Sequence, residues 1–275
     1  MTTVVVKIGG NIAVDPVLDD VADRVRAGER VVVVHGGGPD VDRLAGQLGV
    51  PVRHLHSPDG TRSRRTDPAM LETLTMSLLG RVKPALVAGL RRRGVAAVGL
   101  CGADGGILTA VRKEVLRARE GDRVVLVRDD LSGKLRDVDP RLLRLLLGDG
   151  LVPVLSPPAS TVDGQLLNVD ADRVASAVAV ALDADALLLC TDVPGVLRDP
   201  ADHATVIPTI DTAAVPAVGG RMAHKVRAAV DAVHKGVSTV VIGVDADRGT
   251  RFVQGTPTAQ GTSAQGTRVV QGAAS

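Results

Sequence analysis

The chain has 275 residues, of which 45% are hydrophobic and 23% charged, and its 33 basic residues nearly balance 31 acidic ones. This composition is typical of a globular protein and excludes a disordered or collagen-like chain. The near-neutral charge and the lack of Trp and Tyr disfavour nucleic-acid binding, which uses basic surfaces and aromatic stacking. No apolar run reaches the roughly 18 residues of a membrane span, and the N-terminus has the pattern of a strand, not a signal peptide.

We therefore expect a cytoplasmic protein that binds neither nucleic acid nor membrane. Its two cysteines, Cys101 and Cys190, lie in apolar runs without a metal-type partner spacing. They are expected to be buried free thiols in a reducing compartment.

Short apolar runs rich in β-branched residues alternate with helix-length segments along the chain. The predicted strands are Val4–Ile8, Val31–Val34, Val95–Gly99, Leu151–Leu155, Ala186–Leu189 and Thr239–Gly243. The predicted helices are Asp15–Ala27, Pro39–Leu48, Asp67–Gly80, Lys83–Arg93, Pro140–Leu147, Ala171–Leu182 and Met222–Lys235. Strands that are apolar throughout are typical of a sheet buried on both faces, so the pattern predicts an α/β fold with a mainly parallel sheet.

Three segments depart from this alternation. His54–Arg65 is polar and rich in arginine, which predicts a hairpin or loop over a site. Arg112–Asp139 holds two candidate strands, and we expect a hairpin around the turn Leu131–Lys134. Residues 249–275 repeat Gly-Thr and form a low-complexity tail, in which Gly266–Val270 could be a closing edge strand.

Two glycine-rich turns follow the first two predicted strands. The first is Lys7-Ile8-Gly9-Gly10-Asn11, and the second is His35-Gly36-Gly37-Gly38-Pro39. Glycines at the carboxyl ends of parallel strands let backbone N–H groups approach an anion, and a helix N-terminus adds its dipole. The alternative is that both are simple strand-to-helix turns. His35 itself is more often a packed or capping residue than a proton shuttle.

Two further motifs place charges at helix starts. Asn168-Val169-Asp170-Ala171-Asp172 opens a helix with more polar groups than one cap needs, so Asp172 is free to face a cleft. Lys225 follows the glycine pair Gly219-Gly220 in the first turns of a helix, where the dipole disfavours a cation. Each could still be a cap or a surface charge. A turn at Thr191–Val196 is a candidate for a nucleotide contact.

Together, two lysines, one aspartate and two glycine turns fit phosphoryl transfer, in which catalysis consists of positioning and charge neutralisation. The sequence contains neither a His/Cys cluster that would predict a metal site nor an evident Ser-His-Asp set. The usual nucleotide motifs, GxxxxGK[ST] and GxGxxG, are also absent from the sequence.

The ordered motifs from Val4 to about Gly243 resemble the amino acid kinase family, in particular its acetylglutamate kinase branch. The motifs are Lys7–Gly10, Val34–Pro39, Asp163–Asp172, Thr191–Val196 and Gly220–Val226. The resemblance implies a three-layer αβα sandwich around a mostly parallel sheet. It also implies an acceptor-binding N-terminal lobe (1–155), an ATP-binding C-terminal lobe (156–248) and the tail (249–275).

The same resemblance implies roles for individual residues. Lys7 and Lys225 would be catalytic, stabilising the transferring phosphoryl group, and Asp172 would hold both lysines. The substrate-binding residues would be Gly37, Gly38, Arg64 and Asn168. The phosphate- and ATP-binding residues would be Gly9, Gly10, Thr191, Asp192, Gly195 and Leu197. The cofactors would be ATP and Mg²⁺, with the ion carried by the phosphates and water instead of a protein metal site.

One segment points to a subgroup of this branch. The basic stretch Ser57–Asp67 resembles kinases that act on 2-aminoadipate or glutamate attached to a small acidic amino-group carrier protein. We therefore expect ATP-dependent phosphorylation of the side-chain carboxylate of carrier-linked 2-aminoadipate or glutamate, in lysine- or ornithine-type biosynthesis. The alternatives are an N-acetylglutamate kinase of arginine biosynthesis, with only Arg64 of the basic loop functional, and a non-catalytic nucleotide-binding regulator.

Two departures from the branch carry further expectations. Asp170 stands where many acetylglutamate kinases have asparagine. The chain begins directly at the first predicted strand, without the N-terminal helix of the arginine-inhibited hexameric relatives. We therefore expect a homodimer without arginine inhibition.

Overall fold

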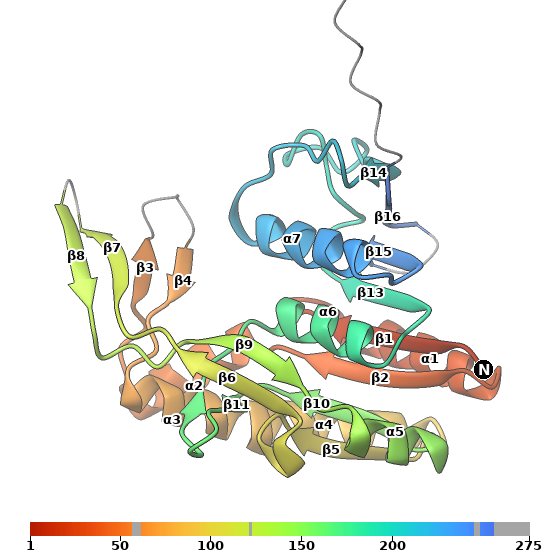
Figure 1. Ribbon diagram of the computed structural model, residues 1–275, viewed down its shortest axis with the longest axis horizontal. Coiled ribbons are helices and arrows are strands. Elements are labelled where there is room, and N and C mark those ends of the chain that lie inside the picture. Colours follow the sequence, from red (N-terminus) through yellow and green to blue (C-terminus); the bar gives the residue numbers. More distant parts are fainter. Residues whose placement is uncertain (57–61, 121–122, 245–247, 256–275) are drawn as a thin grey trace, which may run out of the picture.

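A mixed, mostly parallel sheet forms the centre of the protein. The computed structural model describes residues 1–56, 62–120, 123–244 and 248–255. Within these ranges eight strands pair in the order β14-β16-β15-β13-β1-β2-β10-β5 (Figure 1). Their bounds are β1 (Thr3–Ile8), β2 (Arg30–His35), β5 (Ala97–Cys101), β10 (Val152–Ser156), β13 (Ala186–Cys190), β14 (Thr209–Asp211), β15 (Thr239–Gly243) and β16 (Thr250–Val253). Among these eight strands of the described residues only β15 and β16 pair antiparallel, which confirms the mostly parallel sheet.

Helices cover both faces of this sheet. The helices α1 (Val14–Arg26) and α4 (Lys83–Arg92) lie on one face, and α5 (Arg141–Gly148), α6 (Ala171–Ala181) and α7 (Gly220–His234) lie on the other (Figure 1). Side chains alternate across a strand, so Val4 and Val6 pack toward α1 and α4 whereas Val5 packs toward α6. The three-layer αβα sandwich is thereby confirmed.

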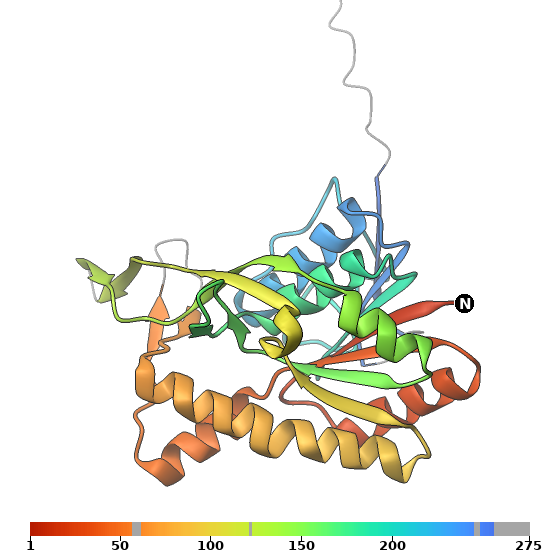
Figure 2. The same cartoon turned by 60° about the horizontal axis from the view of Figure 1, so that its bottom comes forward.

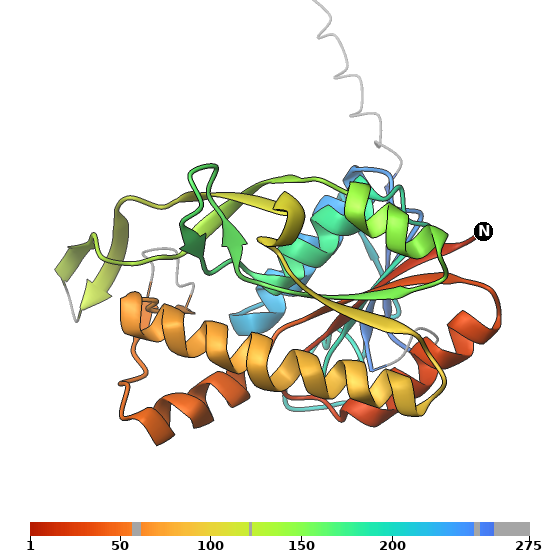
Figure 3. The same cartoon turned by 90° about the horizontal axis from the view of Figure 1, so that it is seen from below.

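One long helix runs beneath the sheet toward the projecting hairpins. It consists of α3 (Pro68–Ser77), a π-helical turn (Leu78–Val82) and α4, and it packs beside α2 (Gly38–Leu48) (Figure 3). The sequence predicted two separate helices here, whereas the π-helical turn joins them without a break. Asp67 caps the start, since its side chain accepts the N–H of Met70 at 2.9 Å.

Two hairpins project side by side from one end of the molecule (Figure 2). They are β3 (His54–His56) with β4 (Arg62–Arg64), as predicted, and β7 (Leu116–Glu120) with β8 (Arg123–Val127). A small apolar cluster of Leu55, Ala118 and Val127 joins them. They therefore form one unit.

The predicted hairpin around Leu131–Lys134 is wrong. The strand β9 (Gly133–Val138) pairs with β6 (Leu108–Arg112) and not with β8, and together with β11 (Ala159–Ser160) and β12 (Leu166–Leu167) they form a second sheet. The physical reason lies in Asn168, whose carbonyl accepts the Gly133 N–H at 2.8 Å while its own N–H donates to Leu131 at 2.9 Å. These bonds tie the segment to the start of α6 instead of folding it into a tight turn.

The predicted start of the tail at residue 249 also needs correction. The strand β16 lies between β14 and β15 in the central sheet, and Phe252 on it is buried. The repetitive composition conceals a short strand with alternating burial. The predicted strand Gly266–Val270 lies outside the described residues.

Both cysteines are buried free thiols, as expected. Burial raises the pKa of Cys190 to about 12, so this thiol is unreactive. Among the residues that the structure describes, no helix is long and apolar enough to cross a membrane.

Candidate active site

The first glycine turn follows β1 at the carboxyl edge of the sheet. A Cβ atom at Gly9 would lie 2.9 Å from the carbonyl oxygen of Cys190 on the neighbouring strand β13. A Cβ atom at Gly10 would lie 2.8 Å from Cδ of Pro39 and 3.0 Å from the amide nitrogen of Gly38. Only glycine therefore permits this turn to pack against both β13 and the second turn.

The second turn follows β2 and leads into α2. Gly37 precedes the helix, Pro39 occupies its first turn, and a Cβ atom at Gly37 would lie 2.6 Å from Cδ2 of Leu78 in the π-helical turn. Proline is favourable at this position because its missing N–H would have no partner there. The N–H groups at the start of α2 thus face the same edge of the sheet as Gly9 and Gly10.

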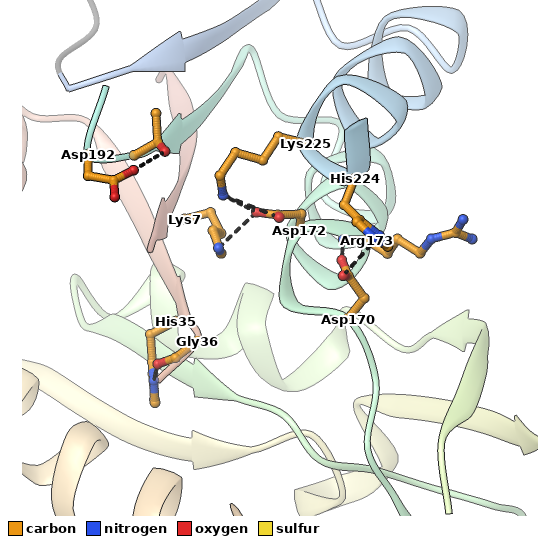
Figure 4. Close-up of polar contacts among 10 residues, drawn as sticks. Lys7, His35, Gly36, Asp170, Asp172, Arg173, Asp192, His224 and Lys225 are labelled. Atoms are coloured by element: carbon orange, nitrogen blue, oxygen red, sulfur yellow. Dashed lines mark hydrogen bonds and ion pairs between the residues drawn. The ribbon is translucent and has the colours of Figure 1, made fainter. Parts of the chain in front are cut away.

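Three charged side chains from distant parts of the chain meet beside these turns (Figure 4). Lys7 lies next to the last residue of β1, Asp172 lies in the first turn of α6, and Lys225 lies on α7. Lys7 Nζ is 2.8 Å from Asp172 Oδ1, and Lys225 Nζ is 3.0 and 3.2 Å from Asp172 Oδ1 and Oδ2. All three residues are less than 10% exposed. One carboxylate therefore holds two ammonium groups at the end of the sheet.

The pKa directions follow from this geometry. Burial opposes the charge of Asp172, but the two ammonium groups outweigh it and hold the pKa of this carboxyl below its ordinary value. Burial and the positive charge of Lys7 lower the pKa of Lys225, whereas for Lys7 the attraction of Asp172 outweighs burial and raises the pKa. Of the two lysines, Lys225 therefore has the lower pKa and loses its proton first as the pH rises.

A cavity of about 790 Å³ opens onto this cluster. Eleven of the predicted site residues line it: Lys7, Gly9, Gly10, Gly37, Gly38, Arg64, Asn168, Asp172, Thr191, Asp192 and Lys225. The Thr191 hydroxyl donates to Asp192 Oδ1 at 3.1 Å at the end of β13. The structure thus brings together residues that the sequence spreads over more than two hundred positions.

Gly195 and Leu197 do not line this cavity. Gly195 is packed against β16, where a Cβ atom would lie 2.7 Å from Thr250 Oγ1, and the next N–H in the chain donates to that hydroxyl at 2.8 Å. Leu197 forms an isolated bridge with Val206. Their assignment to nucleotide binding stays a prediction.

Five cations line the cavity on the side of the hairpin strands β4 and β7 and of β9. We call them the basic rim: Arg62, Arg64, Lys113, Arg117 and Lys134. Arg173, Arg221 and Arg227 of α6 and α7 line the cavity as well. Arg64 forms an ion pair with Asp42 and also donates to the carbonyl of Gly38 at 3.3 Å. Three carboxylates, Asp170, Asp172 and Asp192, also line the cavity, and all three come from the part of the chain after the hairpins.

A buried carboxylate that sequence reasoning missed joins the segment before α3 to the segment before β9. Asp130 is only 1% exposed, and its two oxygens accept the N–H groups of Thr66 and Ser132, each at 2.8 Å. The Thr66 hydroxyl in turn accepts the side-chain amide of Asn168 at 3.0 Å. The sequence signal, an aspartate two residues before a serine, predicts only a local Asx turn.

Asp170 caps α6 by accepting the N–H of Arg173 at 2.9 Å, and its other oxygen lies 3.7 Å from His224 Nδ1 (Figure 4). Asparagine would cap equally well, so the departure at this position preserves the helix start. Within the described ranges no group of three or more His, Cys, Asp or Glu side chains is arranged to hold a metal ion.

Chemically, two buried ammonium groups and two glycine turns suit a polyanion such as a nucleotide phosphate. The basic rim suits a second anion approaching from the outside. A cavity with these two ends can bring a phosphate and an anionic acceptor into line.

Comparison with known proteins agrees with this chemistry. The model of the amino acid kinase family matches residues 2–243. The LysW-aminoadipate kinase of Deinococcus radiodurans is 43% identical over 246 residues, which cover 87% of this chain and 84% of that protein. The acetylglutamate kinase of Archaeoglobus fulgidus is 36% identical over 258 residues, which cover 90% and 87%.

A solved structure supports the fold as well. The protein smu.665 from Streptococcus mutans superposes with a TM-score of 0.75 at 28% identity, over 91% of this chain and 98% of that one. The match to the family model spans both glycine turns, Asp172 and Lys225. The chain belongs to the amino acid kinase family.

Proposed function

We propose that this chain is an ATP-dependent kinase that phosphorylates the side-chain carboxylate of 2-aminoadipate or glutamate carried by a small acidic protein. The observation that carries the proposal is the Lys7–Asp172–Lys225 cluster, which faces two glycine turns at the inner end of a cavity whose outer end is basic. The relative with 43% identity is named for phosphorylating LysW-linked aminoadipate.

The reaction needs charge neutralisation and alignment. A carboxylate oxygen of the acceptor attacks the γ-phosphorus of ATP, the bond from that phosphorus to the β,γ-bridging oxygen breaks, and ADP leaves with the electron pair. The acceptor is already an anion, so no base has to remove a proton. Lys7 and Lys225 offset the charge on the transferring group, Asp172 fixes their positions, and the turn glycines donate N–H groups.

Mg²⁺ fits this proposal as an ion bound to phosphate oxygens, where it would neutralise their charge. Of the three carboxylates lining the cavity, Asp172 is committed to two lysines and Asp170 to the cap of α6, and Asp192 accepts the Thr191 hydroxyl. These residues therefore leave no carboxylate cage, and the ion would travel with the nucleotide.

The basic rim supports the carrier-linked acceptor. A free N-acetylated glutamate has two carboxylates, of which one is phosphorylated, so a single arginine such as Arg64 suffices to bind the other. The five cations of the basic rim line the cavity instead, and Arg62, Arg64 and Arg117 place three of them on the projecting hairpins. Such a field favours an acceptor attached to an acidic chain.

A substrate comparison tests the proposal. Purified protein is assayed for ADP release with an acidic carrier peptide ending in 2-aminoadipate or glutamate, and with free N-acetylglutamate. We expect turnover on the carrier-linked acceptors, and we expect Arg117→Glu to raise their KM by about tenfold or more with little effect on N-acetylglutamate.

The matched control is Arg30→Glu, which makes the same charge change at the amino ends of the parallel strands, away from the cavity. Arg30 begins β2 and is exposed. Its KM values should stay unchanged. Efficient turnover of N-acetylglutamate alone would instead support the acetylglutamate kinase alternative, for which the Archaeoglobus relative is the specific observation.

The two-lobe division of labour belongs to the same proposal. The basic rim comes from residues before 155, whereas Thr191, Asp192 and Lys225 come from later in the chain. The homodimer and the cytoplasmic location stay predictions, to be tested by light scattering and by fractionation.

A further inference from the structure

His35 is a buried imidazole with two hydrogen-bond partners. It ends β2, and the whole residue is inaccessible to solvent. Its Nδ1 lies 2.9 Å from the carbonyl oxygen of Gly36, and its Nε2 contacts the hydroxyl of Ser156 at the end of β10. A carbonyl oxygen only accepts, so Nδ1 carries the proton and Nε2 accepts from Ser156. The two contacts thus select one neutral tautomer.

The charge of this ring is fixed as well. Burial lowers the pKa of His35 to about 4, the bond to Gly36 opposes this effect, and the nearby charges of Lys83 and Lys7 add to it. The ring is therefore neutral near pH 7 and has no access to solvent through which to exchange protons. Its contribution has to come from the hydrogen bond that it donates.

That hydrogen bond controls a peptide group of the second glycine turn. The carbonyl of Gly36 and the N–H of Gly37 belong to the same trans peptide, so they point in opposite directions. With the carbonyl held by the buried ring, the Gly37 N–H points away from the interior, and both glycines line the cavity. The preceding N–H, that of Gly36, is anchored separately to the carbonyl of Ile8 at 3.2 Å.

A peptide between two glycines has little intrinsic preference for one orientation, because both residues reach conformations closed to other amino acids. An external contact has to choose between the two faces of this peptide. His35 supplies that contact, and the donation also polarises the peptide so that its N–H becomes a better donor.

We propose that His35 is a positioning residue, which holds the Gly36 carbonyl so that the Gly37 N–H is aimed at the transferring phosphoryl group. The inference rests on the proposed kinase function. It assigns to the histidine of this turn a role in preorganising a backbone donor, distinct from proton transfer.

Two amide substitutions separate this role from simple packing. In His35→Asn the side-chain amide lies near the position of Nδ1 and can still donate to Gly36. In His35→Gln the amide reaches toward Ser156 instead. Both variants are polar, and both remove the ring. We expect His35→Asn to keep kcat within about fivefold of the wild type and His35→Gln to lose about a hundredfold, with the KM for ATP nearly unchanged in both.

A spectroscopic measurement on the wild type keeps the test independent of folding and of turnover. With ¹⁵N-labelled histidine and glycine, His35 should show the neutral Nδ1–H tautomer. The Gly37 amide should shift when a non-hydrolysable ATP analogue is added, and in His35→Gln this shift should be lost.

The outcomes separate cleanly. Equal kcat in the two variants, an Nε2–H tautomer, or a Gly37 amide unaffected by the analogue would each overturn the positioning role. A wild-type protein that binds the analogue with the expected shift but phosphorylates no acceptor would overturn the proposed function and leave the role of His35 standing.

Discussion

Replacing Asp172 with asparagine removes the one carboxylate that two buried ammonium groups share. Both nitrogens contact the same oxygen, at 2.8 and 3.0 Å, so they lie no more than about 6 Å apart. Two unit charges at that distance repel by about 3 kcal/mol with the effective dielectric constant of about 20 that suits protein sites. In the wild type Asp172 offsets this repulsion, and in Asp172→Asn only the weaker attraction of Asp170 for Lys7 opposes it.

The protein can relieve the repulsion by releasing a proton from one lysine. Lys225 is the candidate, because burial and the charge of Lys7 already lower its pKa. A neutral Lys225 no longer offsets charge on the phosphoryl group, and a penalty of about 3 kcal/mol corresponds to about a hundredfold in turnover. We therefore expect Asp172→Asn to lose about two orders of magnitude in kcat near pH 8.

The pH dependence gives the reasoning its sharpest test. The active form of Lys225 is protonated, so activity in Asp172→Asn should rise as the pH falls through the lowered pKa of this lysine. In the wild type the same rise should lie at higher pH, because Asp172 raises the pKa of Lys225. The assay is ADP release from about pH 6 to 9, with the carrier-linked acceptor saturating.

The matched control is Asp170→Asn, two positions earlier on the same helix. Asparagine caps a helix as well as aspartate does, so the bond to the Arg173 N–H is retained. This variant should keep its kcat and the pH profile of the wild type. Wild-type turnover in Asp172→Asn, or a loss that does not depend on pH, would show that the carboxylate does not act by holding the two charges together.

Three further predictions address other parts of the site. Gly10→Ala places a Cβ atom 2.8 Å from the proline ring at the start of α2, so its kcat should fall at least tenfold. The control Gly46→Ala, with open space around the added Cβ atom, should keep full activity, and equal kcat in the two variants would contradict the packing argument. Asp130→Asn leaves one of two buried N–H groups unpaired, so urea unfolding should show a loss of about 1–3 kcal/mol and kinetics a raised KM for the acceptor alone; a raised KM for ATP would point elsewhere. The pKa of His35 is lowered from 6.5 to about 4, so between these pH values the unfolded state binds a proton that the folded state does not. The free energy of unfolding should therefore fall by up to roughly 3 kcal/mol as the pH drops through this window. The same pH dependence of the unfolding free energy in His35→Asn would assign the loss to other groups.

The inner half of the site could be predicted because its residues follow directly from local sequence. Lys7 and the first glycine turn come immediately after an apolar run, and Asp172 begins an apolar helix. Parallel strands bring their carboxyl ends to one edge, so the topology alone places such motifs together. Local patterns do not predict which of these side chains contact one another. That Asp172 forms ion pairs with both Lys7 and Lys225 is seen only in the structure.

The outer half resisted prediction because it depends on pairing between distant segments. The turn at Leu131–Lys134 has the composition of a hairpin, yet its partner is Asn168. Asp130 follows two charged residues in the sequence and is nevertheless buried, because two N–H groups from separate segments converge on it. Gly195 shows a role that its sequence position does not reveal, since the lack of a Cβ atom permits close packing against Thr250.

The charge balance of the inner cluster explains why such a site persists despite its cost. Two ammonium groups and one carboxylate leave a net positive charge among residues that are almost fully buried. Buried charge is destabilising unless it is paired, and Asp172 pairs fully with neither lysine. A hydrophobic replacement of all three would be expected to fold at least as well. The cluster is therefore better explained by binding an anion than by stabilising the fold. An anion that reaches the glycine turns meets a positive electrostatic field that the folded protein already provides, so little reorganisation is needed when charge moves during transfer.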